Sequence, residues 1–202
     1  MGITPQQFEQ MKNRVAAPRR AATRVFERTG APHRKPHHVI IGIDPSLRGT
    51  GFGIIRLARP QPMVLAQGTV KVPPGCERSR CLLQITQTLR GIIQQHRPSV
   101  CVIESLFYAQ NLQTALIMGE ARGASLVAAA EAGLEIFEIA PRKVKQAIVG
   151  YGAAQKLAVA KMVQHLLGLA DPPAPDAADA LALALTYAQE NGRFSLTPPK
   201  KV

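Results

Sequence analysis

The sequence is poor in acidic residues, in cysteine and in aromatic side chains, and each shortage narrows the class of protein. It has 13 Asp and Glu against 25 Lys and Arg, a formal charge of +12, which points to an anionic partner such as nucleic acid. Its three cysteines lack the paired spacing that is typical of metal sites, so we expect free thiols in a reducing, cytoplasmic compartment. No apolar run approaches the roughly 18 residues that a membrane helix needs, which argues against a membrane protein.

The chain is nevertheless rich enough in apolar residues to bury a core. With 46% hydrophobic residues in a length of 202, it fits one domain of about 150 residues with extensions. We expect this domain over residues 39–190 and a short basic tail over residues 191–202. Residues 1–38 hold eight basic and two acidic residues, which predicts a flexible basic arm with a short helix around Gln6–Val15. Their Arg-rich composition is also compatible with an organellar targeting segment.

The hydrophobic pattern after residue 38 alternates between strand and helix periods. Apolar runs bounded by turn signals predict strands over residues 39–43, 52–57, 65–72, 100–103 and 136–139. Apolar residues at helical spacing predict helices over residues 79–96, 112–132, 142–149, 156–167 and 176–189. Three strands that lead into alternating helices and strands predict an α/β domain, with a mixed five-stranded sheet flanked by helices.

Two of the scarce carboxylates end predicted buried strands. Asp44 follows the apolar run Val39–Ile43, and Glu104 directly follows Val100–Ile103. A carboxylate in such a place is costly unless a cation compensates it, and Arg48 is the basic residue nearest to Asp44 in the sequence. Since open α/β sheets bind ligands at the carboxyl ends of their strands, we interpret both carboxylates as site residues rather than solvated strand ends.

Two further carboxylates, Asp176 and Asp179, begin a predicted helix that is otherwise made largely of Ala and Leu. Their spacing of three residues puts both on one face of that helix. They either cap the helix and complement its dipole, or they join the two strand-end carboxylates in one site. The pair alone does not decide between these interpretations.

Taken together, the four carboxylates suggest one site, and such a site would need cations. Close carboxylate pairs repel by about 4 kcal/mol at an effective dielectric constant of 20. Oxygen-only ligands without Cys or His favour Mg²⁺, or Mn²⁺ in its place, over zinc. Two such ions, held about 3.5–4 Å apart, suit in-line displacement at a phosphodiester, so in this basic chain we expect a nuclease.

Five short motifs in this order resemble the bacterial RuvC family of Holliday junction resolvases. They are Ile41–Gly51, Ile103–Phe107, Met118–Gly123, Val144–Gln146 and Asp176–Ala182. The resemblance runs from about Val39 to Gln189, which is nearly all of the predicted domain. It implies an RNase H-like fold, a homodimer, and Mg²⁺-dependent, paired symmetric nicking of four-way DNA junctions in recombination and repair.

The resemblance also assigns roles to individual residues. It implies two Mg²⁺ per active site and, as catalytic and metal-binding carboxylates, Asp44, Glu104, Asp176 and Asp179. It places Phe107 at an aromatic position that stacks near the junction centre, and Lys145 and Lys156 at basic positions that contact DNA near the cut. Arg122 stays outside this set as a candidate structural ion pair. A branch-migration complex of the RuvA–RuvB type is a possible partner.

The chain departs from the family pattern in two places close to the predicted site. Ser46 and Leu47 follow Asp44 and Pro45 where the family usually has Gly, so we expect a turn of different shape. Gln110 stands where family members often carry Lys, so we expect one DNA contact to be missing or moved.

Three other functions share parts of this pattern. A nuclease that cuts RNA–DNA hybrids would use the same carboxylates. A sugar-kinase-like or actin-like ATPase also begins with a strand, an Asp and a Gly- and Thr-rich turn, but it needs a longer chain. A junction-binding protein without catalysis gains nothing from negative charge concentrated near DNA. Cleavage assays on junctions and hybrids, with and without Mg²⁺, distinguish these functions.

Overall fold

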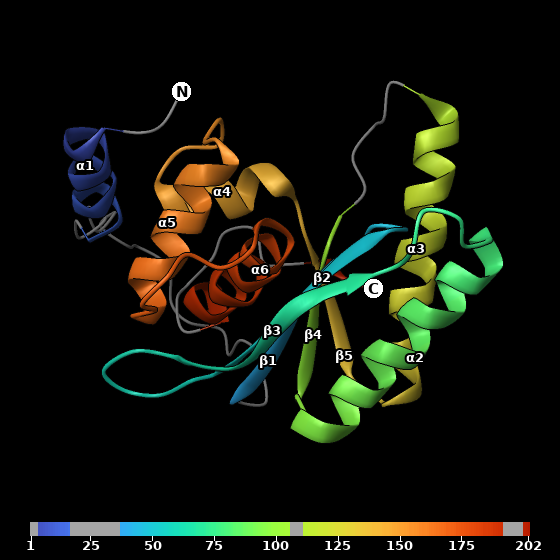
Figure 1. Ribbon diagram of the computed structural model, residues 1–202. Coiled ribbons are helices and arrows are strands. Elements are labelled where there is room, and N and C mark those ends of the chain that lie inside the picture. The colour runs from blue at the N-terminus through green and yellow to red at the C-terminus, as the bar shows by residue number, and fades with distance from the viewer. Residues whose placement is uncertain (1–3, 17–36, 106–110, 192–199) are drawn as a thin grey trace, which may run out of the picture.

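The computed structural model describes residues 4–16, 37–105, 111–191 and 200–202, and a mixed sheet forms its centre (Figure 1). The strands are β1 (Val39–Asp44), β2 (Gly49–Arg56), β3 (Met63–Lys71), β4 (Val100–Glu104), β5 (Glu135–Ile139) and β6 (Lys200–Lys201). Their order across the sheet is β3-β2-β1-β4-β5-β6. The first three form an antiparallel meander, β4 and β5 run parallel to β1, and β6 runs antiparallel to β5. The predicted five-stranded mixed sheet is confirmed, and the C-terminal tail adds a short sixth strand.

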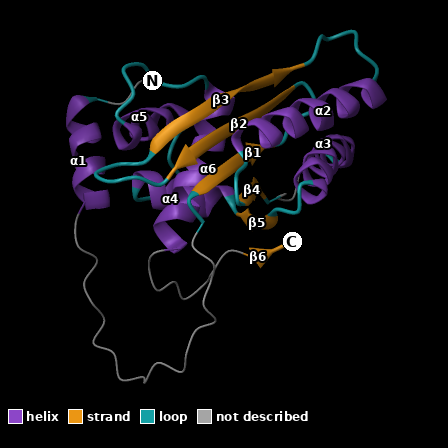
Figure 2. Ribbon diagram, turned by 90° about the horizontal axis from the view of Figure 1, so that it is seen from below, coloured by secondary structure: helices purple, strands orange, loops and turns teal. Residues whose placement is uncertain are grey.

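Helices cover both faces of this sheet (Figures 1 and 2). They are α1 (Pro5–Ala16), α2 (Arg78–His96), α3 (Leu112–Glu131), α4 (Pro141–Val149), α5 (Lys156–Leu167) and α6 (Pro175–Asn191). Helices α2 and α3 share a core with Ile41 and Ile43, whereas α4, α5 and α6 share the other core with Ile40 and Val102. Alternate residues of β1 therefore enter opposite cores. Among the described residues, no helix is long and apolar enough to cross a membrane.

Helix α6 crosses β1 and β2 at very short distance because both strands carry glycine beneath it. A Cβ atom at Gly42 would lie 2.0 Å from the carbonyl oxygen of Ala180. A Cβ atom at Gly51 would lie 2.1 Å from the carbonyl oxygen of Asp176. Strand β2 accordingly begins at Gly49, earlier than predicted, because these glycines serve close packing and not only the turn. The close approach sets the first turn of α6 directly against the sheet.

The N-terminal helix α1 confirms the short helix that the sequence predicts, but it is packed onto the domain. Met11 is 3% exposed and belongs to the core beneath α4, α5 and α6. The Phe8 ring meets His165 of α5 edge to face, with 6.2 Å between the ring centroids. The expectation of a flexible arm over all of residues 1–38 is therefore wrong for this helix. Two apolar residues one turn apart hold the helix against the domain, and so short an apolar stripe gives only a weak signal of packing in the sequence.

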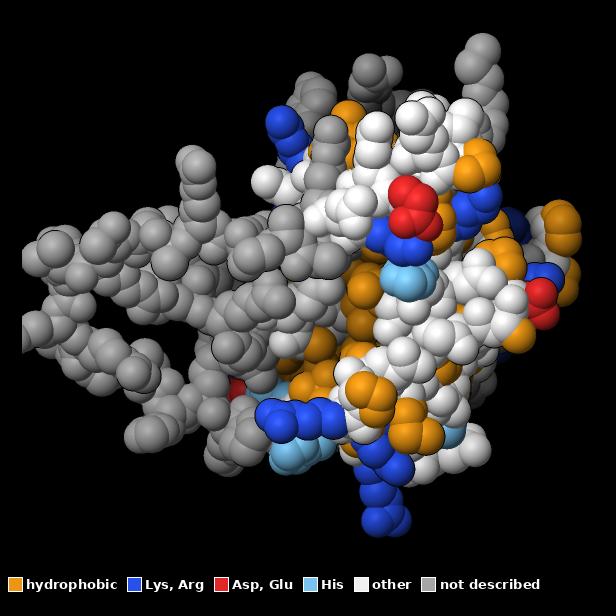
Figure 3. All heavy atoms as spheres, turned by 90° about the vertical axis from the view of Figure 1, so that its left-hand side faces the viewer, with side chains coloured by type: hydrophobic (Ala, Val, Ile, Leu, Met, Phe, Trp, Pro, Cys, Tyr) orange, Lys and Arg blue, Asp and Glu red, His pale blue; other side chains and the backbone are white. Residues whose placement is uncertain are grey.

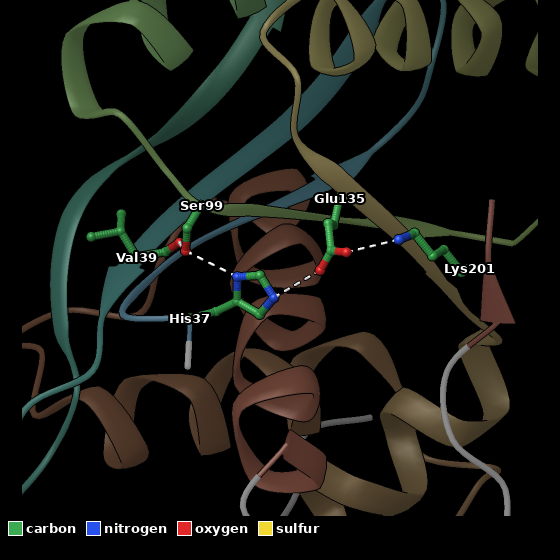
Figure 4. Close-up of polar contacts among 5 residues, drawn as sticks. All are labelled: His37, Val39, Ser99, Glu135 and Lys201. Carbon is green, nitrogen blue, oxygen red and sulfur yellow. Dashed lines mark hydrogen bonds and ion pairs between the residues drawn. The ribbon is translucent and has the colours of Figure 1, made fainter. Parts of the chain in front are cut away.

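A polar cluster around His37 ties the C-terminal strand to the start of the sheet (Figure 4). The Nδ1 atom of His37 lies 3.2 Å from Ser99 Oγ, and its Nε2 atom lies 3.2 Å from Glu135 Oε2. Lys201 Nζ donates to Glu135 Oε1 at 2.7 Å, which lowers the pKa of that carboxyl group. The Ser99 hydroxyl donates to the carbonyl oxygen of Val39 at 3.1 Å. The cluster lies at the amino ends of β1, β4 and β5.

Candidate active site

Asp44 and Glu104 lie side by side at the carboxyl ends of two neighbouring strands. The parallel register of β1 and β4 pairs Ile43 with Ile103, so a carboxylate follows on each strand. Val102 packs in the core beneath α6, and alternation along the strand turns Glu104 to the same face. The two carboxyl groups lie close enough that each perturbs the pKa of the other. The structure thus brings together the two strand-end carboxylates that the sequence singled out.

Helix α6 brings Asp176 and Asp179 to the same place. Thr69 of β3 donates its hydroxyl to Asp176 Oδ2 at 3.4 Å. The negative charge of Asp179 raises the pKa of both Asp44 and Glu104, which shows that it lies close to them. Both aspartates of α6 therefore lie near the strand-end carboxylates, as the interpretation of one shared site predicts.

A lysine compensates part of this negative charge. Lys156, the first residue of α5, donates from Nζ to Asp179 Oδ2 at 2.8 Å. The ammonium group also lowers the pKa of Asp44 and of Glu104. Arg48, the cation that is nearest to Asp44 in sequence, instead donates to the carbonyl oxygens of Pro73 and Cys76.

Burial and like charge shift the protonation of the two strand-end carboxyl groups. Burial, followed by the charges of Asp44 and Asp179, raises the pKa of Glu104 from 4.5 to about 8. Burial, followed by the charge of Asp179, raises the pKa of Asp44 from 3.8 to about 6. Near neutral pH, without a bound cation, the pair therefore tends to hold a proton in place of one negative charge.

The donor set of this cluster suits a hard divalent cation. All four side chains offer carboxylate oxygen and none offers nitrogen or sulfur, which is the ligand chemistry of Mg²⁺ and Mn²⁺. Within the described ranges, no three Asp, Glu, His or Cys side chains are placed so that they could hold a metal ion together without rearranging. The Lys156 ammonium, paired with Asp179, offsets part of the negative charge of the cluster. A cation bound here would take over that role.

Comparisons with known proteins fit this geometry. The family model for the crossover junction endodeoxyribonuclease RuvC matches residues 40–187. The chain belongs to the RuvC family. The RuvC of Chromohalobacter salexigens is 42% identical over 162 residues, which cover 80% of this chain and 87% of that protein. The RuvC of Halorhodospira halophila is 46% identical over 149 residues, which cover 74% of this chain and 89% of that protein.

Solved structures confirm the predicted RNase H-like fold of this RuvC family member. T. thermophilus RuvC in complex with a Holliday junction substrate is 34% identical, with a TM-score of 0.74 over 82% of this chain and 100% of that one. The yeast mitochondrial Holliday junction resolvase Ydc2 has a TM-score of 0.51 at 9% identity over 73% of this chain and 77% of that one, a likeness of fold alone. Five motifs spread along the sequence thus identified the family correctly.

The turn that follows Asp44 and Pro45 is closed by a threonine. Thr50 is fully buried, donates its hydroxyl to the carbonyl oxygen of Ser46 at 2.6 Å, and accepts from the Ser46 amide at 3.2 Å. Pro45, Leu47 and Met118 help to line a hollow of about 700 Å³ beside this turn. Ser46 and Leu47 are therefore accommodated by a turn that Thr50 fixes.

The three predicted DNA contacts have different outcomes. Lys156 lies at the cluster, 69% exposed while it pairs with Asp179. Lys145 lies in α4, half-buried, and its ammonium makes no hydrogen bond or ion pair with another residue that the structure describes. Phe107 lies outside the described residues, as does Gln110. The DNA-binding roles of all three residues stay predictions.

Two residues near the site were not predicted as part of it. Thr69 bonds Asp176, and a threonine in a strand gives no signal in sequence. Arg122 of α3 pairs with Glu138 at 2.7 Å, which confirms the structural ion pair that the sequence analysis expected. Arg122 also contacts the main chain of Glu104, which sequence cannot show.

Proposed function

We propose that the protein is an endonuclease that resolves four-way (Holliday) DNA junctions by paired symmetric nicks, in DNA recombination and repair. The observation that carries this proposal is the convergence of four carboxylates, from β1, β4 and α6, at one edge of the sheet in a member of the RuvC family. A junction is the substrate named for the T. thermophilus relative, which this chain matches over that relative's whole length.

The catalytic groups in this proposal are Asp44, Glu104, Asp176 and Asp179. We assign them as ligands of two Mg²⁺ ions, with Mn²⁺ as a substitute; the ions would supply an activated water and stabilise the charge on the leaving 3′ oxygen. Since burial and like charge raise the pKa values of Asp44 and Glu104, cation binding would be coupled to the release of protons from them. Thr69 would hold the Asp176 carboxylate through its hydroxyl.

Three residues would contact the DNA. Lys156 is mostly exposed, so its ammonium can reach a phosphate beside the carboxylates while it neighbours Asp179. Lys145 has an ammonium free of described partners, which suits a phosphate contact. Phe107 would stack near the junction centre, as the family pattern implies. On the face drawn in Figure 3, basic side chains stand out at several places and acidic ones at few, which favours a polyanionic partner.

The working form in this proposal is a homodimer. Leu112 and Leu116 of α3 are 75% and 58% exposed, and Val127 farther along the helix is 50% exposed. A Cβ atom at Gly123 would meet nothing within 4 Å. At helical spacing these residues form one stripe, an exposed apolar face that a second copy of the chain would cover. Two copies related by a two-fold axis would present two identical sites to the paired strands of a junction.

The proposal includes two points of cellular context. A nuclease that acts on recombining chromosomal DNA would work in the bacterial cytoplasm. A RuvA–RuvB branch-migration complex is a candidate partner, because a resolvase needs junctions that can move to its preferred cut sites.

One cleavage experiment tests the proposed function. The protein is incubated with a mobile four-way junction, a linear duplex of the same sequences and an RNA–DNA hybrid, each with Mg²⁺ and with EDTA. We expect paired nicks in opposite strands of the junction with Mg²⁺, and little cutting of the other substrates. Preferential cutting of the hybrid would overturn the junction assignment, and binding of the junction without cleavage in Mg²⁺ or Mn²⁺ would overturn the enzymatic one.

A further inference from the structure

Arg122 and Glu138 form a mostly buried ion pair behind the carboxylate cluster. Arg122 lies in the middle of α3 and Glu138 lies in β5, with 2.7 Å between Nη2 and Oε2. Their side chains are 13% and 19% exposed. Glu138 pairs in register with Ile103, which faces the core beneath α2 and α3. The ion pair therefore lies on the face of the sheet opposite to the one that α6 covers.

The guanidinium group of Arg122 makes a second bond, and this one reaches the strand that carries a site carboxylate. Its Nε donates to the main-chain carbonyl oxygen of Glu104 at 3.3 Å. The amide of the same peptide unit, Ser105 N–H, donates to the carbonyl oxygen of Ile139 at 3.0 Å. The peptide between Glu104 and Ser105 is thus held on both sides, its oxygen by α3 and its N–H by β5.

The hydrogen bond from Arg122 matters because the peptide between Glu104 and Ser105 lies next to the carboxylate cluster. Glu104 is the last residue of β4, and its carboxylate is crowded by the charges of Asp44 and Asp179. Repulsion among these groups favours a rotation that turns the Glu104 side chain away from the cluster. The planar fork of arginine holds two acceptors in a fixed geometry, which the single ammonium of lysine does not reproduce.

We propose that Arg122 is a positioning residue for the nuclease site: by bonding the Glu104 carbonyl oxygen it fixes the last peptide of β4 and holds the Glu104 carboxylate beside Asp44, ready to bind a divalent cation. The inference rests on the proposed metal-dependent function. It differs from a merely structural ion pair, which would stabilise α3 against β5 without any effect on cation affinity.

Three variants separate these two roles. Arg122→Lys retains a cation for Glu138 but loses the planar fork that also reaches Glu104. Glu138→Gln retains an acceptor for Nη2 and leaves the Nε bond in place, although the ion pair is gone. Arg90→Met removes another ion pair to α3, the one that Arg90 makes with Glu131 at 2.6 Å, on the same side of the sheet.

Binding of Mn²⁺ to the full-length protein without DNA, measured by electron paramagnetic resonance, is the deciding readout, with thermal unfolding measured in parallel. We expect Arg122→Lys to weaken Mn²⁺ binding about tenfold, the size that loss of a group supporting a metal ligand typically has. The other two variants should stay within about twofold of the wild type, whatever they do to the unfolding temperature.

Unchanged Mn²⁺ affinity in Arg122→Lys would overturn the positioning role, as would an equal loss in Glu138→Gln. Cleavage at varied Mg²⁺ gives a second check, since a positioning defect should be partly rescued by excess cation. The proposed function fails separately: in that case the wild-type protein itself would neither bind Mn²⁺ nor cut junctions.

Discussion

Lys156 Nζ, at the start of α5, donates a hydrogen bond to Asp179 Oδ2, in the first turns of α6, at 2.8 Å. The ammonium group stands among four carboxylates and lowers the pKa of Asp44 and of Glu104 while it bonds Asp179. The hydrogen bond with Asp179 in turn raises the pKa of Lys156. The Lys156 ammonium and the raised pKa values of Asp44 and Glu104 therefore both limit the negative charge of the cluster, and a cation that binds here has to compete with that ammonium and with protons.

The strand-end carboxylates should be essential for cleavage and dispensable for binding. We expect Asp44→Asn and Glu104→Gln each to reduce junction cleavage about 10³-fold or more, because several kcal/mol of charge stabilisation are lost with a metal ligand. Junction affinity in EDTA should be unchanged or higher, since less negative charge faces the phosphates. Single-turnover cleavage and gel-shift titration measure the two effects. Cleavage near the wild-type rate by either variant in Mg²⁺ would show that the assignment is wrong.

The raised pKa values predict how stability depends on pH. The pKa of Glu104 rises from 4.5 to about 8 and that of Asp44 from 3.8 to about 6, so between these values the folded protein holds protons that the unfolded chain has released. The stability contributed by these groups is present below pH 4 and is lost as the pH rises through 6 and 8.

We therefore expect the unfolding temperature of the wild-type protein in EDTA to fall between pH 5 and pH 8, relative to that of the Asp44→Asn, Glu104→Gln double variant. Added Mg²⁺ should remove this relative fall, because the cation stabilises the ionised carboxylates. Thermal unfolding followed by circular dichroism across the pH series measures the difference. A wild-type protein that gains stability relative to the variant as the pH rises would contradict the raised pKa values.

The glycines beneath α6 should be intolerant of even one methyl group. In Gly42→Ala the new Cβ would lie 2.0 Å from the Ala180 carbonyl oxygen, so α6 has to move away from β1. We expect a loss of about 3 kcal/mol or more in the free energy of unfolding, at the upper end of the cost of overpacking a core. Gly91→Ala in α2 is the matched control. Its Cβ would meet nothing within 4 Å, so higher helix propensity should stabilise the protein by up to about 1 kcal/mol. Urea denaturation of both variants and of the wild type measures the two changes in the free energy of unfolding.

A site residue could be predicted from the sequence only where its local sequence context is unusual. Asp44 and Glu104 were predictable because a charged residue directly after a buried strand is conspicuous, and because parallel strands end at the same edge. The joining of Asp176 and Asp179 to that edge could not be predicted from the pair alone, since a helix cap explains the same spacing; it followed from the four carboxylates taken together and from the family resemblance. The contacts of Lys156, Thr69 and Arg122 depend on how helices pack in three dimensions, and no local pattern carries that information.

The fold was predictable to a similar extent. Hydrophobic periods located the five main strands and the five helices from α2 to α6, because each is long or strongly patterned. The start of β2 was misplaced because glycine is typical of turns, whereas here Gly51 lies in the strand and its lack of a side chain lets the backbone of α6 pack closely against it. Strand β6 has two residues. Backbone pairing with β5 and the ion pair of Lys201 with Glu135 hold it in place, and these partners are far away in sequence.

The exposed stripe of α3 predicts how the dimer can be broken. We expect Leu116→Glu to put a charge into the shared apolar face and to shift the protein toward monomer by tenfold or more in dissociation constant, since burying an unpaired charge costs several kcal/mol. Leu157→Glu on α5 is the matched control, because Leu157 is 45% exposed and lies on the other side of the sheet. Sedimentation velocity gives the dissociation constants. If the Leu116→Glu protein remained dimeric, this face of α3 would not be part of the dimer interface.

The basic residues of the N-terminal arm should contribute affinity without selectivity. Residues 1–38 carry a net charge of +6 out of +12, and α1 with the buried Met11 attaches their start to the domain. Phosphate contacts release counterions and read no sequence, so the arm should strengthen binding to junctions and linear duplexes alike. Deletion of residues 1–36 would remove this charge, but it would also strip Met11 from the core. A variant with Arg19, Arg20, Arg24 and Arg28 changed to Gln removes charge and leaves α1 intact.

We expect this quadruple variant to bind both DNA shapes more weakly, most of all at low salt, with the same ratio between junction and duplex as the wild type. For every phosphate that the variant no longer binds, the slope of log affinity against log salt should become shallower by about 0.9. Single-turnover cleavage of saturated junction should be unchanged, because the carboxylates lie on the strands and α6, away from the substituted residues in sequence. Titrations of both proteins against junction and duplex across a salt series measure the slopes. Identical slopes would mean that these arginines do not touch DNA, and a change confined to the junction would mean that they recognise its shape.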